Sequence, residues 1–272
     1  MTMRSAGWLA VVLWGSTPVV AAPKLPSVCE SVEADEAGAS PRALPEEVTK
    51  ALDAIVRSEL SQGPVAGLSV AVSRGEQRWV CGYGYRDVAK RLPATPRTTY
   101  RMASVTKSFT AVAVLQLVEQ GKLSLDADIH AVVPTYPEKQ WTVTVKDLLG
   151  HLSGVPTYDG VASTQNVKAV STEEALAVFS HKPLAFEPRS RYLYSTWGYN
   201  LLGAAVESAS GQSYRDYLRE HVFQPAGMAH ADLDVTATRD EHQAVGYRVR
   251  DGVLQRSRFL DVSSRFGGGG TR

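Results

Sequence analysis

Two short runs of β-type residues stand close together in the first third of the chain. Residues 67–73 and 77–83 alternate apolar with small or polar residues, and only Arg74-Gly75-Glu76 separates them. Two such runs joined by a short turn with glycine predict an antiparallel hairpin. A hairpin is only marginally stable by itself, so the rest of the fold must supply a layer that packs on it.

Helical patterns lie on both sides of this hairpin. Apolar residues recur at helical spacing from Pro45 to Gln62, and Gly63-Pro64 ends that segment. A second helix is expected from the Ser104 region to Gly121, which is placed as a C-terminal cap. Capping-box spacings predict three more helices: Thr144 with Asp147, Ser171 with Glu174, and Ser213 with Asp216. The predicted fold class is therefore α/β (α+β).

Length, charge and motif content limit the function classes. The 272 residues suit one large domain, or two lobes that share a core. The net charge is +1 and no basic run alternates with aromatic residues, so we expect no nucleic-acid partner. The six histidines form no His-x-His or His-Glu-x-x-His pattern, so no metal ion and no cofactor are predicted. No Gly-x-Ser-x-Gly sequence occurs, which disfavours an α/β-hydrolase.

The first residues have the composition of a secretory signal. Arg4 precedes an apolar stretch over residues 6–13, and a weaker apolar stretch leads to Ala21-Ala22. We predict that residues 1–21 are a signal peptide, which implies a secreted or periplasmic protein. A membrane anchor is the alternative, but residues 15–18 interrupt the segment before it reaches the ~20 apolar residues of a span. No stable membrane span is expected.

The next segment and the two cysteines leave one question open. Residues 22–43 are rich in Pro, Ser, Ala and acidic residues without apolar periodicity, so we expect a linker there and one folded domain over residues 44–272. Cys29 and Cys81 are the only cysteines, and in an oxidising compartment they could pair. Two free thiols are equally compatible with the sequence, because it does not give the Cα separation that a disulfide needs.

The strongest chemical signal is Ser104-x-x-Lys107 at the start of an apolar helix. If Ser104 opens the helix, Lys107 shares its face, so the amine can reach the hydroxyl. A serine hydroxyl needs a neighbouring base to act as a nucleophile, and a lysine whose pKa falls in a desolvated site can serve. Backbone N–H groups at the helix N-terminus would stabilise the oxyanion of a tetrahedral intermediate. The plain alternative is a serine N-cap with an exposed lysine.

A second signal surrounds Tyr194, which stands just ahead of a buried helical run. A phenol beside a lysine can move a proton, although its reference pKa is about 10. The alternative is a packed aromatic ring whose hydroxyl group is hydrogen-bonded.

Four segments together resemble one family. Ser104-Val105-Thr106-Lys107, residues 148–154, Tyr194-Ser195-Thr196 and residues 223–228 occur in the order and spacing of the class C β-lactamase-related serine hydrolases. This family includes esterases, D-aminopeptidases and D-alanyl-D-alanine carboxypeptidases. The resemblance extends from about Leu44 to Arg272. The Tyr-Ser-Thr form is most similar to the mitochondrial serine β-lactamase-like type, which is linked to peptidase activity and filament formation, so oligomerisation is implied by analogy alone.

The resemblance implies a β-lactamase/DD-peptidase-like fold, with an antiparallel sheet flanked by helices and a mostly helical lobe. It implies that Ser104 is the acylated nucleophile, that Lys107 is its partner, and that Tyr194 is the base or proton shuttle. Thr196 stands where family members often have Asn, and we expect it to bind substrate. Because a hydroxyl cannot present an amide fork, ester or peptide cleavage is favoured over β-lactam turnover.

His151 and Ser153 belong to one of the family-like segments, and we interpret them as structural residues in a turn that closes a helix. Catalysis by His151 is the less favoured alternative. Gly267 to Gly270 is interpreted as a flexible turn rather than a phosphate loop, because no Lys-Ser or Lys-Thr follows it.

The family's third motif, a Lys or His followed by Thr or Ser and then Gly on a strand edge, is absent from the sequence. We therefore expect the C-terminal strands of the fold to be missing, the domain to be incomplete at its C-terminus, and the hairpin to show an open sheet edge.

The sequence thus favours a serine hydrolase that acts on an amide or ester bond of a small-molecule or peptide substrate through an acyl-enzyme on Ser104. The rival is a truncated, non-catalytic β-lactamase-like binding protein or an inactive fragment, which the missing third motif favours.

Overall fold

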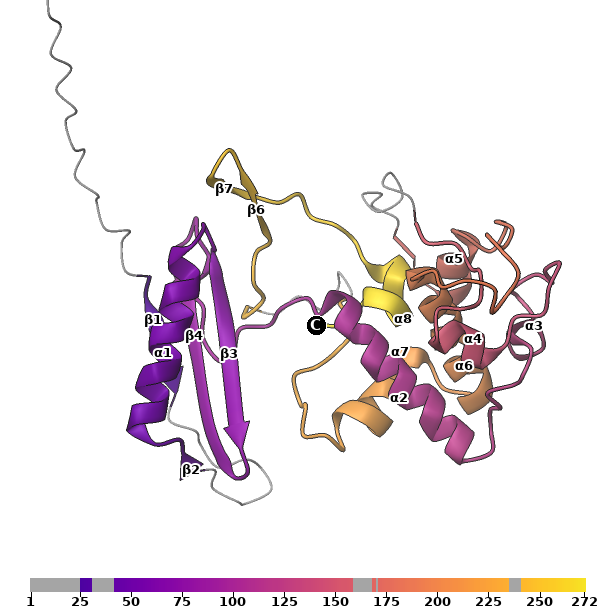
Figure 1. Cartoon of the computed structure of the whole chain (residues 1–272), viewed down its shortest axis with the longest axis horizontal. Coiled ribbons are helices and arrows are strands. Elements are labelled where there is room, and N and C mark those ends of the chain that lie inside the picture. The colour runs from indigo at the N-terminus through magenta and orange to yellow at the C-terminus, as the bar shows by residue number, and fades with distance from the viewer. Residues whose placement is uncertain (1–24, 31–41, 159–167, 170, 235–240) are drawn as a thin grey trace, which may run out of the picture.

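The computed structural model describes residues 25–30, 42–158, 168–169, 171–234 and 241–272. The predicted signal peptide, residues 1–21, lies outside the described residues. A small sheet covered by one helix is joined to a larger helical lobe (Figure 1). This arrangement confirms the predicted α/β class.

The predicted hairpin forms the centre of the sheet. β3 (Gly67–Arg74) and β4 (Gln77–Asp87) pair antiparallel, from Gly67 opposite Gly84 to Arg74 opposite Gln77. Gly75 turns the chain with a φ of +58°, a conformation that favours glycine. Within the described residues β3 pairs with β4 alone, so its second edge carries no strand. This open edge was predicted from the sequence.

Part of the predicted linker forms strands instead. β1 (Ser27–Glu30) pairs antiparallel with β4, and β2 (Arg42–Ala43) pairs in parallel with the first residues of β4. β5 (Leu92–Pro93) pairs with the other end of β4. The linker prediction is wrong for β1 and β2, because runs of four and two residues are too short to show a period.

Cys29 and Cys81 lie opposite each other in β1 and β4 and form a disulfide bond. Of the two alternatives that the sequence left open, the structure contains the bonded pair. The bond ties the N-terminal strand to the longest strand of the sheet.

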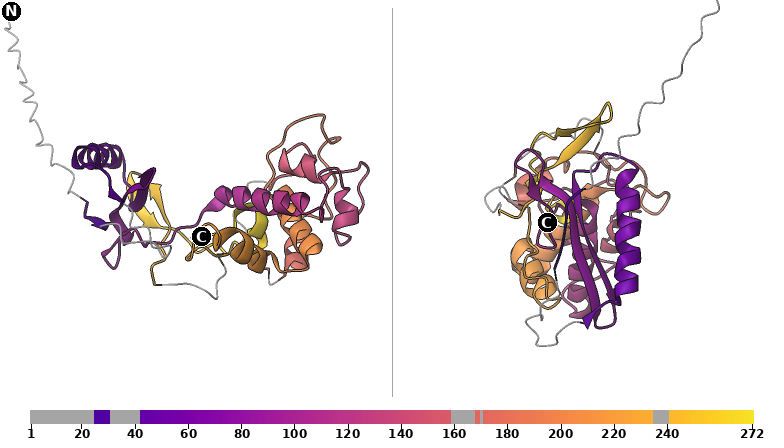
Figure 2. Two further views of the ribbon diagram at one scale, coloured as in Figure 1. Left: turned by 90° about the horizontal axis from the view of Figure 1, so that it is seen from below. Right: turned by 90° about the vertical axis from the view of Figure 1, so that its left-hand side faces the viewer.

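α1 (Glu46–Ser61) packs on the sheet (Figures 1 and 2). Its apolar positions, which include Val48, Leu52 and Val56, complete a small separate core. The buried members of this core are Leu44, Leu60, Trp79, Cys81 and Tyr83. The hydroxyl of Tyr83 donates to Asp53 of α1 at 2.9 Å.

The helical lobe is built around α6 (Thr196–Ser210), whose residues 196–206 are all buried. A helix that is apolar on every side belongs in the middle of a core. The helices that pack against it are α2 (Thr106–Glu119), α3 (Ile129–Val132), α4 (Val145–Leu149), α5 (Thr172–Ala177), α7 (Tyr214–Leu218) and α8 (Phe266–Gly269). The short helical turns η2 (Arg219–Phe223) and η4 (Ser263–Arg265) and the hairpin of β6 (Tyr247–Arg250) and β7 (Val253–Arg256) complete the described chain.

The three predicted helix starts are confirmed. Side-chain oxygens accept the expected backbone N–H groups: Thr144 from Asp147, Ser171 from Glu174, and Ser213 from Asp216. In the described ranges, no helix combines the length and the apolar character that crossing a membrane would take.

Candidate active site

Ser104 lies in a short 3₁₀ turn, η1 (Ala103–Val105), that leads directly into α2. The sequence predicts that Ser104 opens the helix, but the helix begins two residues later, at Thr106. Ala103 has a φ of +45°, in the left-handed region, which costs a non-glycine residue about 1–2 kcal/mol. Such strain persists only where the surrounding structure holds the backbone in place.

Lys107 lies in the first turn of α2 and its side chain is buried. Its Nζ donates to Ser104 Oγ at 3.2 Å, to Thr196 Oγ1 at 3.4 Å and to the carbonyl oxygen of Gly268 at 2.5 Å. Three acceptors match the three protons of an ammonium group. The alternative of a serine N-cap with an exposed lysine is therefore wrong, because Val105 is the N-cap and Lys107 is enclosed.

Tyr194 reaches the same hydroxyl from the segment that precedes α6. Its phenol oxygen lies 2.7 Å from Ser104 Oγ, and Lys107 Nζ lies 4.7 Å from the centre of its ring. Burial raises the pKa of this phenol, but the hydrogen bonds with Lys107 and Ser104 and the charge of Lys107 together lower it by more. The net pKa of Tyr194 is therefore below the ordinary value, and the phenolate forms more easily.

Thr196 completes the group at the first residue of α6, where Ser195 is the N-cap. Its buried hydroxyl lies 3.4 Å from Lys107 Nζ and 3.5 Å from the hydroxyl of Tyr158. The structure thus brings together the four residues that the sequence singled out, namely Ser104, Lys107, Tyr194 and Thr196.

The contribution of α8 to the site was not predicted from the sequence. The glycines predicted to form a flexible turn are largely helical and packed, since Gly267 and Gly268 are buried in α8. A Cβ on Gly268 would lie 2.4 Å from Cγ2 of Thr196 and 2.5 Å from its carbonyl oxygen, so this contact with α6 requires glycine. The flexible-turn prediction is wrong because a run of glycines is compatible both with a turn and with close backbone approach.

Buried hydrogen bonds hold α8 between α2 and α6. The hydroxyl of Thr110 donates to the carbonyl of Gly267 at 2.6 Å, and the side-chain oxygen of Asn200 accepts the N–H of Gly268 at 3.1 Å. The N–H of Thr271 donates to the hydroxyl of Thr106 at 3.1 Å. The carbonyl that accepts from Lys107 is therefore fixed from both helices.

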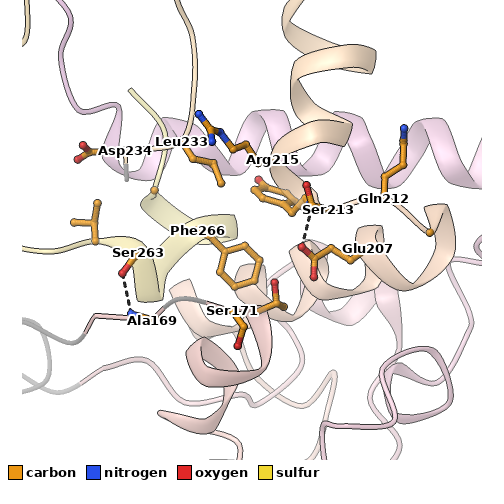
Figure 3. Close-up of a pocket in the computed structure, with 15 residues that line it drawn as sticks. Ala169, Ser171, Glu207, Gln212, Ser213, Arg215, Leu233, Asp234, Ser263 and Phe266 are labelled. Carbon is orange, nitrogen blue, oxygen red and sulfur yellow. Dashed lines mark hydrogen bonds between the residues drawn. The ribbon is translucent and has the colours of Figure 1, made fainter. Parts of the chain in front are cut away.

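Phe266 of α8 lies beside a cavity of 590 Å³ (Figure 3). The charged side chains in its wall have partners within the protein. Glu207 accepts the N–H of Tyr214 at 2.8 Å, and Asp234 pairs with Arg101. The wall therefore presents no charged side chain that lacks a partner in the described structure.

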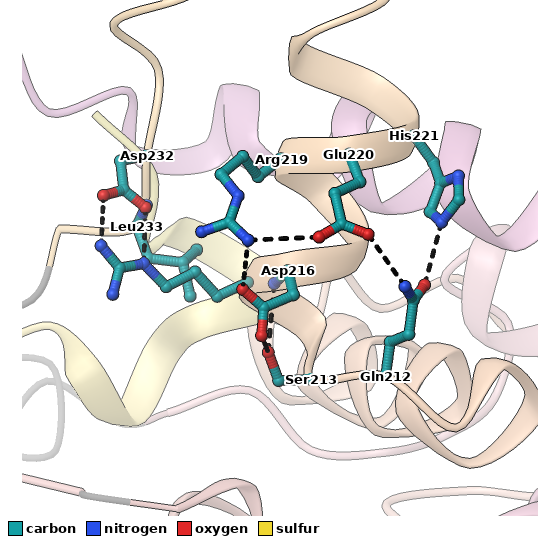
Figure 4. Close-up of polar contacts among 9 residues, drawn as sticks. Gln212, Ser213, Asp216, Arg219, Glu220, His221, Asp232 and Leu233 are labelled. Carbon is teal, nitrogen blue, oxygen red and sulfur yellow. Dashed lines mark hydrogen bonds and ion pairs between the residues drawn. The ribbon is translucent and has the colours of Figure 1, made fainter.

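An ion pair at the rim of this cavity fixes α7. Arg215 of α7 pairs with Asp232 at 2.5 Å (Figure 4). The same helix places the hydroxyl of Tyr214 2.6 Å from that of Thr110, the residue that bonds Gly267. Helix α7 thereby supports the contact between α2 and α8.

His151 follows α4 and lies beside the candidate site, with its ring 4.5 Å from that of Tyr194. Ser153 is buried and accepts the N–H of Val155 at 3.2 Å. Among the residues that the structure describes, no group of three or more His, Cys, Asp and Glu side chains could hold a metal ion.

Comparison with known proteins identifies the family. The family model described as Beta-lactamase matches residues 52–272. Protein flp of Staphylococcus aureus (strain MW2) is 31% identical over 207 residues, which cover 73% of this chain and 41% of flp. The mitochondrial serine beta-lactamase-like protein LACTB of Homo sapiens is 32% identical, over 76% of this chain and 50% of LACTB. The chain thus spans half or less of the length of these curated relatives.

Solved structures agree with this comparison. The octameric penicillin-binding protein homologue from Pyrococcus abyssi has a TM-score of 0.69 and 32% identity, and the match covers 82% of this chain and 53% of that one. The D-amino acid amidase from Ochrobactrum anthropi SV3 has a TM-score of 0.72 and 28% identity, over 83% of this chain and 67% of that one. With its fold, its grouped side chains and a family match over most of its length, the chain belongs to the Beta-lactamase family of serine hydrolases.

Proposed function

We propose that this chain is a serine hydrolase that cleaves an amide or ester bond through an acyl-enzyme on Ser104. One observation carries the proposal. The hydroxyl of Ser104 lies 2.7 Å from the phenol oxygen of Tyr194 and 3.2 Å from the ammonium of Lys107. In this contact the phenol donates to Ser104, and after it ionises the phenolate can accept the serine proton, which is what activation of a serine nucleophile needs.

In the proposed reaction, Tyr194 carries the proton. Ser104 Oγ bonds to the substrate carbonyl carbon while the phenolate of Tyr194 takes the hydroxyl proton. The phenol then gives that proton to the leaving amine or alkoxide as the bond from carbon to the leaving group breaks. Water next attacks the acyl carbon, Tyr194 takes a proton from the water and returns one to Ser104, and the acid product leaves. The positive charge beside it, on Lys107, stabilises the negative charge on Tyr194.

Thr196 bears on the substrate class. Its side chain offers one hydroxyl and no amide fork, so we expect ester, amide or peptide substrates and little turnover of β-lactams. The similarity to a D-amino acid amidase that was solved with D-phenylalanine makes amides of single amino acids the first substrates to test.

We also propose that the protein works in a secreted or periplasmic compartment. The disulfide between Cys29 and Cys81 supports this location, because disulfides persist in oxidising compartments. The signal-like composition of residues 1–21 agrees with it.

The proposal is tested by acylation of the full chain with a fluorescent fluorophosphonate. We expect the wild type to be labelled and Ser104→Ala to be unlabelled. Ser108→Ala is the matched control, since Ser108 is an exposed serine in the first turn of α2, four residues after Ser104, and it should label like the wild type. Circular dichroism shows whether each protein is folded. Folded wild-type protein that takes up no label would reject the hydrolase and leave a non-catalytic binding protein as the better account.

A further inference from the structure

His151 has an uncommon backbone conformation directly after α4. Its φ is +58°, in the left-handed region that histidine enters more often than most non-glycine residues. In this turn the N–H of Leu152 donates to the carbonyl of Asp147 at 2.8 Å. From the turn the imidazole lies among tyrosine rings, at 4.5 Å from Tyr194 and 5.1 Å from Tyr199 between ring centres.

Three contacts join His151 to the segment that carries Tyr194. The carbonyl of His151 accepts the N–H of Leu193 at 2.9 Å, and its Nδ1 accepts the N–H of Ser195 at 3.2 Å. Between these two residues, the ring of Tyr194 is inclined by 39° to the imidazole. One histidine therefore contacts the phenol-bearing residue and both of its neighbours in the chain.

The hydrogen bond that the N–H of Ser195 donates to His151 is compatible with only one protonation state of the imidazole. An imidazole nitrogen accepts a hydrogen bond only when it carries no proton, so Nδ1 is bare and the proton of the neutral ring is on Nε2. In the charged ring Nδ1 also carries a proton, which would face the N–H of Ser195. Two donors would then face each other and the hydrogen bond would be lost.

We propose that His151 is the positioning residue for Tyr194, and that protonation of His151 inactivates the site by releasing the phenol from Ser104. This inference rests on the proposed role of Tyr194 as proton acceptor. His151 itself takes no part in bond making, because its contacts are to the rings of Tyr192, Tyr194 and Tyr199 and to backbone groups.

The groups around His151 favour the neutral ring. Lys107 of α2 contributes a positive charge, and the rings of Tyr192, Tyr194 and Tyr199 surround the imidazole. Burial, and then the charge of Lys107, lower the pKa of His151 below its ordinary value of 6.5. The positioning contact is therefore present near neutral pH and is lost as the solution becomes acidic.

Two variants distinguish the effect of the acceptor nitrogen of His151 from the effect of its aromatic ring. In His151→Asn, Oδ1 can take the place of Nδ1 as acceptor for Ser195, and Asn tolerates a positive φ and does not titrate. In His151→Phe, a ring remains beside Tyr194 but the acceptor is gone. The rate of fluorophosphonate labelling is measured for both variants and the wild type from about pH 8 to about pH 5, a range that includes histidine protonation.

We expect the wild-type rate, divided by the rate of His151→Asn, to fall about tenfold from the upper to the lower end of this range. A displacement of a reacting group by ~1 Å can cost about 10²-fold, so partial release of Tyr194 accounts for such a loss. The ratio cancels the ionisation of Tyr194 itself, which occurs in both proteins. His151→Phe should label about tenfold more slowly than the wild type at the upper pH. A constant ratio, or a Phe variant as fast as the wild type, overturns the inference.

A second measurement needs no turnover. Tyrosine carrying carbon-13 at the phenol carbon is incorporated into the full chain, and the NMR signal of Tyr194 is assigned with Tyr194→Phe. The signal should shift in the wild type as His151 becomes protonated and should shift less in His151→Asn. A wild-type signal that does not respond overturns the inference whether or not the probe reacts. A responsive signal in a protein that takes up no label would reject the proposed hydrolase while supporting the positioning contact.

Discussion

The ammonium of Lys107 has two effects on its surroundings. It donates to the carbonyl of Gly268 at 2.5 Å, which ties α2 to α8, and it lowers the pKa of the Tyr194 phenol. The first effect concerns the position of a helix and the second concerns the supply of a base. A variant that keeps the length of the side chain but lacks the ammonium loses both effects, and the pH dependence of its labelling reports the second.

Lys107→Met is expected to lower the rate of probe labelling by about 10²–10⁴-fold near neutral pH, the usual contribution of acid–base catalysis. The pKa of Tyr194 is lowered in the wild type, so the loss of the Lys107 hydrogen bond and charge should raise it. The remaining activity should therefore appear at higher pH than in the wild type. A pH profile of labelling measures both changes, and Lys122→Met, an exposed lysine beyond the end of α2, should leave the profile unaltered.

Gly268→Ala tests the packing of α8 at the level of one methyl group. The added Cβ would lie 2.5 Å from the carbonyl oxygen of Thr196, so either α8 or α6 must move. Overpacking of this kind costs about 1–3 kcal/mol of unfolding free energy, and the movement should also slow labelling. Gly269→Ala is a control from the adjacent residue, because its Cβ would have no neighbour closer than 3.7 Å. The unfolding free energy is measured with urea and the labelling rate with the probe. Equal changes in Gly268→Ala and Gly269→Ala would contradict the close approach of Gly268 to Thr196.

At the scale of elements, the disulfide is the covalent support of β1, a strand of only four residues. It joins cysteines 52 residues apart, and the chain entropy lost from the unfolded state by closing such a loop corresponds to about 4 kcal/mol. Reduction is therefore expected to lower the unfolding free energy by about 2–4 kcal/mol, measured by urea unfolding with and without a thiol reductant.

The same reduction should leave the labelling rate in the absence of urea nearly unchanged, because the bond joins β1 to β4 in the sheet and Ser104 lies in η1, the turn that leads into the helical lobe. Cys29→Ser provides the control, since reductant should have no further effect on it. If labelling disappears on reduction while the protein stays folded, the candidate site depends on the disulfide and the prediction is wrong.

Elements whose signals are local were predictable, and elements that depend on a distant partner were not. The helix starts at Thr144, Ser171 and Ser213 were predicted because the capping side chain and its N–H partner lie three residues apart. β1 and α8 were missed because each is stabilised mainly by contacts with β4 or α6, far away in the sequence. Neither has enough residues for a hydrophobic period to appear.

At the scale of the whole molecule, the side chains of the candidate site could be predicted from the sequence, whereas its backbone contacts could not. The spacing of Ser104 and Lys107 predicted their contact, and the order of family-like segments predicted that Tyr194 and Thr196 would join them. The carbonyl of Gly268 could not be predicted, because every residue has a backbone carbonyl and only the tertiary structure selects one. The acceptor role of His151 Nδ1 was not predicted for a similar reason, since its donor is a backbone N–H.

Among the residues that the structure describes, two hydrophobic cores are separate, one between α1 and the sheet and one inside the helical lobe. Every residue of the candidate site belongs to the helical lobe or to the turn that enters it. The sheet contributes the fold's covalent crosslink and its open edge, and the helical lobe contributes the grouped polar side chains.

The bond between Lys107 and Gly268 spans 161 positions of the chain, and it has a consequence for biosynthesis. A nascent chain that has passed Tyr194 but has not yet reached Phe266 contains Ser104, Lys107 and Tyr194 but has no α8 against which to order the lysine. We therefore expect the proposed nucleophile to lack its ordered lysine until residues 266–269 have been added to the chain.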